Sequence, residues 1–167
     1  MSPLVFITGV SSGIGQALAR RYAQAGWRLA LSARRGEELA TWCRAQGWPS
    51  GSWAVYGADV RDAASITAAG RACLDRQGLP DVVIANAGIS IGVDTEDRED
   101  IDVIARTFAT NNIGLAATFH PFIAGMKQRG SGRLVGIASV AGIRGLPGHG
   151  AYSASKAAVI AYCESLR

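Results

Sequence analysis

Short apolar runs alternate with longer amphipathic segments over the first 90 residues. Four runs have the length and composition of buried strands: residues 4–7, 29–31, 52–56 and 82–84. Between them, apolar residues recur at helical spacing over 14–25, in the segment opened by Glu37 and Glu38 and closed by Gly47, and over 62–77. Strands that alternate with helices predict parallel β-α-β units.

The second half of the chain is richer in helix. Residues 94–102 are acidic and polar, which predicts a loop, and 101–126 reads as one long helical region that Pro121 bends or breaks. A fifth strand is expected at 134–137, a glycine-rich loop at 141–150 and a helix over 151–167. The pattern predicts an α/β fold with a doubly wound parallel sheet in three layers, of the Rossmann type, with five strands of a larger sheet. We therefore expect residues 1–167 to form a single domain that is truncated at the C-terminus.

Composition narrows the class of protein. With 167 residues, of which 49% are apolar and 18% charged, the chain can bury a core and one domain is expected. Three separated cysteines and two histidines fit neither a disulfide framework nor a metal site, so we expect no metal and a reducing, cytoplasmic location. No apolar run spans a bilayer and no basic leader precedes residue 4, so neither a membrane segment nor a secretory signal is expected.

The net charge of +4 comes mostly from arginine, with 15 Arg and 2 Lys. These charges are spread along the chain without a block of like charges, so nucleic-acid binding is not indicated. A mild positive field suits a small anionic ligand.

A glycine-rich turn follows the first predicted strand. It comprises the candidate nucleotide-binding residues Gly9, Ser11, Ser12, Gly13, Ile14 and Gly15. Glycines at a strand-to-helix turn let backbone N–H groups approach a pyrophosphate, and Ser11 or Ser12 is able to cap the helix. A glycine-rich turn without a ligand is the alternative.

Two further strand ends carry candidate nucleotide contacts. After the second strand, where an acid would bind the ribose of NAD, the chain has Ala33, Arg34 and Arg35, and a guanidinium favours the 2′-phosphate of NADP. The alternative is a pair of solvated arginines, above all for Arg35. The fourth strand ends in the small residues Asn86, Ala87 and Gly88, which let a ligand or a neighbouring backbone come close.

The most specific pattern is Tyr152 followed four residues later by Lys156, which places both on one face of a helix. A nearby ammonium favours phenolate over phenol, so such a tyrosine suits general acid–base catalysis near neutral pH. Ser139 follows the fifth strand, where open α/β sheets place their ligands. A surface Tyr–Lys pair and a capping serine explain each residue singly, but not their occurrence together.

Taken together, these motifs resemble the short-chain dehydrogenase/reductase family along the whole chain. The resemblance implies that Tyr152 exchanges a proton with the substrate oxygen, that Ser139 holds that oxygen, and that Lys156 binds the nicotinamide ribose and tunes Tyr152. Tyr152 and Lys156 are thus expected both as catalytic and as cofactor-binding residues. It further implies Asn111 rather than Asn112 as a fourth catalytic residue, with a kink asparagine bonded to its own backbone as the alternative. It places Asp59 and Val60 against the adenine, where Asp59 alone would read as a turn or cap residue.

The sequence thus predicts an NADP-dependent oxidoreductase that interconverts a carbonyl and an alcohol. NAD is the less favoured cofactor. A dinucleotide-binding module without turnover is the alternative, because the resemblance implies that the substrate-covering region lies beyond residue 167; a methyltransferase needs no Tyr-x-x-x-Lys and is disfavoured. One hypothesis is an apolar substrate pocket lined by Ile89, Ser90, Ile143 and Leu146. Another is a substrate contact from His149, for which a solvent-facing loop histidine is the favoured alternative. The resemblance also implies a homodimer or homotetramer formed by 101–126 and the alanine-rich last helix.

Overall fold

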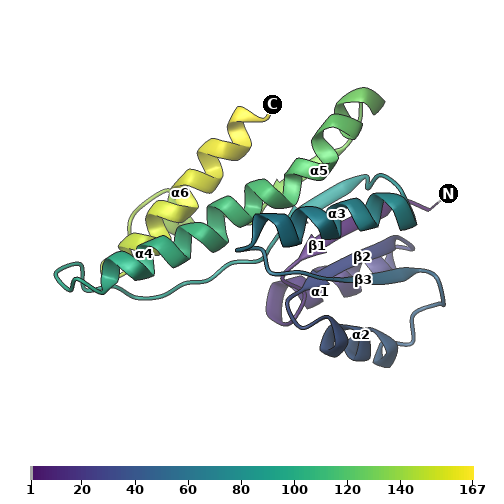
Figure 1. The fold of residues 1–167 in the computed structure, drawn as a ribbon, viewed down its shortest axis with the longest axis horizontal. Helices are drawn as coiled ribbons and strands as arrows, with labels where there is room; N and C mark the ends of the chain where they lie inside the picture. The colour runs from purple at the N-terminus through teal and green to yellow at the C-terminus, as the bar shows by residue number, and fades with distance from the viewer. Residues whose placement is uncertain (1) are drawn as a thin grey trace.

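Five parallel strands form the centre of the structure, a computed structural model that describes residues 2–167 (Figure 1). The strands are β1 (Leu4–Thr8), β2 (Arg28–Ala33), β3 (Trp53–Gly57), β4 (Val82–Ala85) and β5 (Arg133–Gly136). Their order in the sheet is β3-β2-β1-β4-β5. The predicted doubly wound α/β sheet is confirmed, with each strand within one or two residues of its expected bounds.

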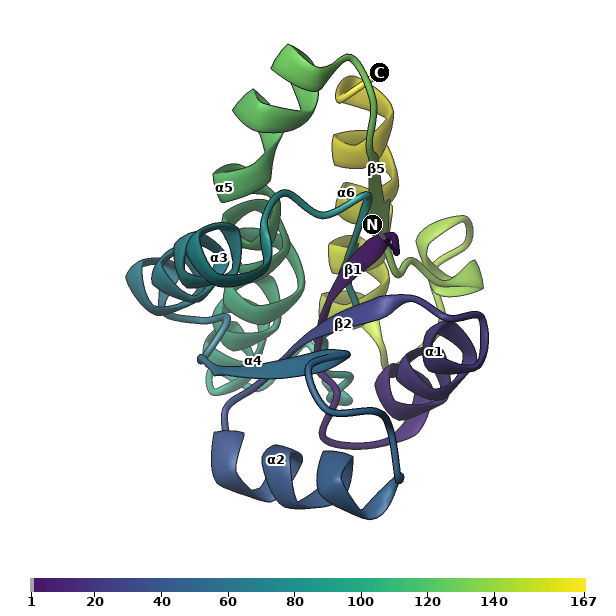
Figure 2. The same cartoon turned by 90° about the vertical axis from the view of Figure 1, so that its right-hand side faces the viewer.

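Helices cover both faces of the sheet (Figure 2). They are α1 (Gly13–Gln24), α2 (Gly36–Ala45), α3 (Ala63–Gln77), α4 (Asp100–Phe108), α5 (Gly114–Arg129) and α6 (Gly150–Ser165). Local chemistry fixes some of these ends: Asp62 caps α3 by accepting hydrogen bonds from the N–H groups of Ala64 and Ser65, at 2.9 and 3.2 Å. No helix among residues 2–167 is both long and apolar enough to cross a membrane.

Each face of the sheet has its own hydrophobic core, because successive side chains of a strand point to opposite faces. Leu4 and Phe6 of β1 belong to a larger core with side chains of α3, α5 and α6. Val5 and Ile7 belong to a smaller core with side chains of α1 and α2. All four are fully buried, which explains why β1 reads as an unbroken apolar run rather than an alternating one.

The long helical region differs from the prediction at its break. Pro121 lies inside α5 without interrupting it, and the interruption is instead a π-helical turn at Ala109–Ile113, between α4 and α5. The proline ring packs closely on α3, where a Cβ at Gly70 would lie 2.7 Å from Pro121 Cγ. The break therefore occurs at Asn111, one of the predicted site residues.

The strand order places the site. From β1 the chain winds outward to β2 and β3, then crosses back to add β4 and β5 on the other side of β1. Since β1 pairs in parallel with β4, through Ile7 opposite Ile84, the segments that leave these two strands diverge at the same edge of the sheet. Such a switch point is where open α/β sheets bind ligands.

Candidate active site

The turn after β1 is held against the end of β4 by hydrogen bonds. Asn86 Nδ2 donates to the carbonyl oxygens of Thr8 and Gly9, at 3.0 and 3.1 Å, and the N–H of Asn86 donates to Thr8 Oγ1 at 3.1 Å. Gly9 has a φ of +71°, and a Cβ there would lie 2.7 Å from the Cα of Ala87. A side chain at Gly15 would collide with the Gly9 carbonyl. These glycines are thus required by close backbone packing as well as by ligand access.

The start of α1 leaves its backbone donors free for a ligand. Ser12 occupies the N-cap position, but its side chain makes no capping hydrogen bond, and the first turn carries no acidic residue. The expectation that a serine caps this helix through its hydroxyl is therefore wrong for Ser12. Within residues 2–167, Ser11 contributes its carbonyl alone, which accepts from Gln16 Nε2. An uncapped helix N-terminus presents N–H groups and a positive dipole end to an anion.

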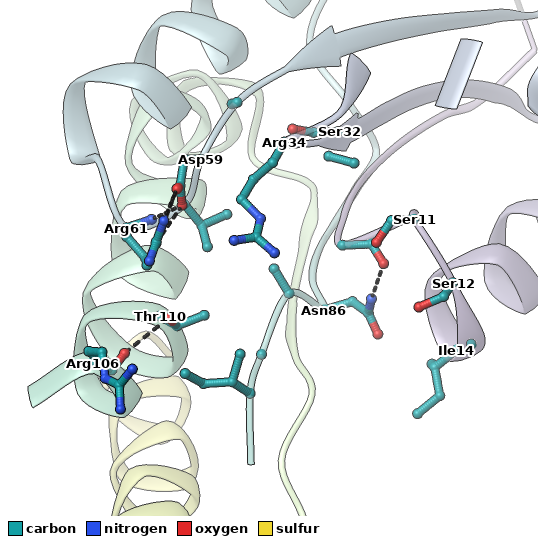
Figure 3. Close-up of a pocket in the computed structure, with 18 of the residues that line it drawn as sticks. Ser11, Ser12, Ile14, Ser32, Arg34, Asp59, Arg61, Asn86, Arg106 and Thr110 are labelled. Carbon is teal, nitrogen blue, oxygen red and sulfur yellow. Dashed lines mark hydrogen bonds and ion pairs between the residues drawn. The ribbon is translucent and has the colours of Figure 1, made fainter. Parts of the chain in front are cut away.

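A cavity of about 390 Å³ opens at this switch point (Figure 3). Twelve nucleotide-binding residues are predicted after the first four strands, and all of them except Gly15 line the cavity. The eleven that line it are Gly9, Ser11, Ser12, Gly13, Ile14, Arg34, Asp59, Val60, Asn86, Ala87 and Gly88. The Ser32 hydroxyl also lines the cavity, is buried, and has no hydrogen-bond partner within residues 2–167. An unpaired hydroxyl, an uncapped helix end and an arginine fit a polar, anionic ligand such as a dinucleotide.

At one wall of the cavity a carboxylate and two arginines lie close together (Figure 3). Arg61 binds the carboxylate of Asp59 through two nitrogens, with Nη2 2.7 Å from Oδ2 and Nε 3.1 Å from the same oxygen. These hydrogen bonds hold the pKa of Asp59 below its ordinary value, and the charge of Arg34 lowers it further. Arg35 points elsewhere: it pairs with Glu38 at 2.6 Å, outside the cavity, as the solvated-arginine interpretation expected.

Tyr152 and Lys156 lie on α6 beside the cavity rather than in its lining. Lys156 is buried, its Nζ donates to the carbonyl of Ile137 at 2.5 Å, and Nζ lies 5.6 Å from the centre of the Tyr152 ring. Burial lowers the pKa of Lys156. A Cβ at Gly88 would lie only 3.6 Å from Lys156 Nζ, so the lysine adjoins the cavity at Gly88.

Asn111 joins three segments of the chain. Its Oδ1 accepts from the N–H of Ile89 at 2.9 Å, and its Nδ2 donates to the Ile89 carbonyl at 3.0 Å and to Ser155 Oγ at 2.9 Å. The alternative of an asparagine bonded to its own backbone is therefore wrong for this residue. Asn112 bonds the backbone of α6 instead, donating to the Ser155 carbonyl at 2.9 Å. The π-turn thus directs adjacent side chains to different partners.

The structure places Ser139 three residues after β5, at the start of a short 3-10 turn at Val140–Gly142. Its Oγ accepts a capping hydrogen bond from the N–H of Ala141 at 3.2 Å, which leaves the hydroxyl proton available. Of the four residues expected to line an apolar substrate pocket, Ile89 lines the cavity, whereas Ser90, Ile143 and Leu146 are exposed. His149 is also exposed and sits at the N-cap of α6.

Sequence reasoning missed two kinds of residue. The first kind lines the cavity without belonging to a motif: Ser32, Ala58, Arg61, Ile91, Arg106 and Thr110. Among these, Arg106 and Thr110 have a detectable signal, because they stand four residues apart on one helical face next to Asn111. The second kind is Ser155, fully buried, whose Oγ also donates to the Tyr152 carbonyl at 2.7 Å.

A cavity at the switch point of a parallel sheet, with a tyrosine and a buried lysine on the adjoining helix, is typical of dinucleotide-binding α/β domains. Comparison with known proteins agrees with this class. The family model described as short chain dehydrogenase matches residues 3–167. The chain belongs to the short-chain dehydrogenase/reductase family.

Named relatives extend the comparison. Estradiol 17-beta-dehydrogenase 1 of Rattus norvegicus is 40% identical over 172 residues, covering 99% of this chain and 49% of the rat protein. An alcohol dehydrogenase from Thermococcus sibiricus, solved with 5-hydroxy-NADP, superposes with a TM-score of 0.88 at 30% identity, covering 99% of this chain and 70% of the other. A short-chain dehydrogenase/reductase from Burkholderia phymatum, solved with NAD, superposes with a TM-score of 0.87 at 31% identity, covering 99% of this chain and 59% of the other. The chain thus spans about half the length of the rat protein, and its structural relatives bind either nucleotide.

Proposed function

We propose that the protein is an NADP-dependent oxidoreductase that interconverts a carbonyl and an alcohol. The observation that carries the proposal is the adjacency of two sites: the cavity at the switch point, and Lys156 with Tyr152 at its Gly88 end. The absence of an acid at the end of β2, where Arg34 lines the cavity, supports NADP over NAD. Three free cysteines, two of them buried, support a cytoplasmic location.

In this proposal the chain's own residues bind the nucleotide and move the proton. NADP supplies or accepts the hydride when it is bound. The glycine turn and the start of α1 hold the pyrophosphate, and Arg34 holds the 2′-phosphate. Tyr152 exchanges a proton with the substrate oxygen, the Ser139 hydroxyl donates a hydrogen bond to it, and the Lys156 ammonium favours the phenolate.

The surface after Ser139 supports an apolar substrate. Val140 and Ile143 are 77% and 82% exposed, and Leu146 is 46% exposed, which is unusual for large apolar side chains gathered on one loop. The similarity to an estradiol dehydrogenase is consistent with an alcohol or ketone on an apolar skeleton. We therefore propose that the substrate is apolar around the reacting oxygen.

Replacing Arg34 by aspartate tests the choice of nucleotide. Arg34→Asp removes the guanidinium proposed to bind the 2′-phosphate and adds a repelling charge, so affinity for NADPH should fall at least tenfold more than affinity for NADH. Calorimetry with both cofactors measures the difference. Arg35→Asp is the matched control, since Arg35 is paired with Glu38 outside the cavity. Equal losses for the two cofactors, or a wild-type preference for NADH, would contradict the proposal.

We also propose that the protein forms a homodimer or homotetramer through α4, α5 and α6. Ile101, Ile104 and Ile113 are 56%, 41% and 58% exposed on this helical region, and the alanines of α6 at 154, 157 and 161 are exposed as well. Apolar and small side chains on neighbouring helices suit close helix contacts between copies. Sedimentation velocity at micromolar concentration should show a dimer or larger species. A monomer at every concentration tested would count against this assembly.

A further inference from the structure

The Asp59 carboxylate lies at the wall of the nucleotide cavity with both oxygens engaged by one neighbour. Arg61 Nη2 and Nε contact Oδ2 at 2.7 and 3.1 Å, Nε contacts Oδ1 at 3.2 Å, and the Arg61 N–H donates to Oδ1 at 3.0 Å. Both residues line the cavity. Asp59 and Arg61 are two residues apart in sequence, so the contact forms locally, just before α3, and requires no distant segment.

Arg34 enters the same cavity from the end of β2 (Figure 3). Its guanidinium points into the space between Asp59 and Asn86, and no carboxylate within residues 2–167 pairs with it. Asp59 is the acidic residue among the cavity-lining side chains, and the charge of Arg34 contributes to lowering the pKa of its carboxyl. A bare Asp59 carboxylate would therefore compete with a phosphate for Arg34, because both anions accept the same forked hydrogen bonds.

We propose that Arg61 determines nucleotide specificity indirectly: by binding the Asp59 carboxylate it leaves Arg34 free to bind a 2′-phosphate. The inference rests on the proposed use of NADP. It assigns to Arg61 a positioning role rather than a contact with the phosphate. A direct contact between Arg61 and the 2′-phosphate is the competing explanation, and the two differ in what removal of the Asp59 charge does.

The test uses two probes that match the adenosine half of the cofactor, adenosine 2′,5′-bisphosphate and adenosine 5′-monophosphate. The measured quantity is the ratio of their dissociation constants, taken by calorimetry at one fixed ionic strength. Any contact of Asp59 with the base affects both probes equally and cancels in this ratio. Arg61→Ala should lower the preference for the bisphosphate by about tenfold, as expected when a charged hydrogen-bonding partner is diverted.

The double variant Asp59→Asn with Arg61→Ala distinguishes the two explanations. If Arg61 acts by neutralising Asp59, removing that charge should restore the preference to within about threefold of wild type; if Arg61 contacts the phosphate, the loss should persist. Arg35→Ala is the matched control, because it also breaks an arginine–carboxylate pair, of 2.6 Å, but outside the cavity, and it should leave the ratio within about twofold. Circular dichroism verifies that each variant is folded, as expected for an Arg61 side chain that is 49% exposed.

The outcomes separate the inference from the function on which it rests. A wild-type protein that binds both probes equally refutes the use of NADP, and the role of Arg61 with it. A wild-type protein that prefers the bisphosphate, combined with an unchanged ratio in Arg61→Ala or no restoration in the double variant, refutes the inference alone. Loss of preference in Arg61→Ala and its recovery in the double variant support it.

Discussion

Tyr152→Phe should abolish most of the carbonyl reduction while leaving cofactor binding intact. The substitution keeps the ring and removes the hydroxyl that exchanges the proton, so the rate should fall by roughly 10²–10⁴. Cofactor affinity should change little, because Tyr152 does not line the nucleotide cavity. The measurement is the steady-state rate on a carbonyl substrate, with cofactor affinity determined separately by calorimetry.

Tyr162→Phe is the matched control for this substitution. Tyr162 lies on the same helix, packed against the larger core, and should be replaceable with little effect on the rate. A Tyr152→Phe variant that reduces substrates at nearly the wild-type rate would exclude the tyrosine as the proton donor. A dinucleotide-binding module without turnover would then describe the protein better.

Lys156→Met should produce two separable losses. It removes the buried charge 5.6 Å from the Tyr152 ring centre, so the pH at which the rate changes should move upward, because the phenolate loses a stabilising neighbour. It also removes the amine that adjoins the cavity at Gly88, so cofactor affinity should fall. A pH–rate profile and a cofactor titration measure the two effects. An exposed helical pair of this spacing would be worth only about 0.2–0.5 kcal/mol and would move neither quantity.

Lys127→Met is the control for both measurements, because Lys127, the other lysine of the chain, is exposed near the end of α5.

The pH dependence of protein stability gives an independent readout of Lys156. Burial lowers its pKa in the folded protein, so the unfolded chain binds more protons between the lowered value and the ordinary value of 10.5. The free energy of unfolding should therefore rise with pH in that alkaline window for wild type relative to Lys156→Met. An identical pH dependence in the two proteins would contradict a lowered pKa of Lys156 in the folded protein.

The features that the sequence predicts well are those encoded by neighbouring residues. The apolar run at β1 and the glycines at 9, 13 and 15 identify a strand and its turn from their own composition, and the structure places both as expected. Strand order is different, because no local pattern says that β4 will pair with β1 rather than with β3. The resemblance to a known family supplied the roles of Asn111 and Asp59, which remain predictions.

What the sequence did not predict depends on contacts between distant segments. Asn111 is bonded to residues 22 and 44 positions away, so neither the π-turn nor the role of Ser155 is visible from local spacing. Of the bend or break expected at Pro121, the break does not occur: α5 continues through the proline, whose ring packs against Gly70 of α3. The Arg61 contact with Asp59 is local, but a two-residue spacing is too common to indicate a site.

The division of each strand between two cores limits where the chain can change length. Phe6 serves one core and Ile7 the other, so a single inserted residue within β1 would exchange their faces and bury each against the wrong helices. The same insertion would shift Gly9 away from Ala87, where the backbones have no room for a side chain. Exposed segments such as 94–99 and 143–149 carry no such double constraint. Insertions and deletions are therefore compatible with this architecture in exposed loops away from the cavity, whereas the spacing from β1 to Gly9 is fixed.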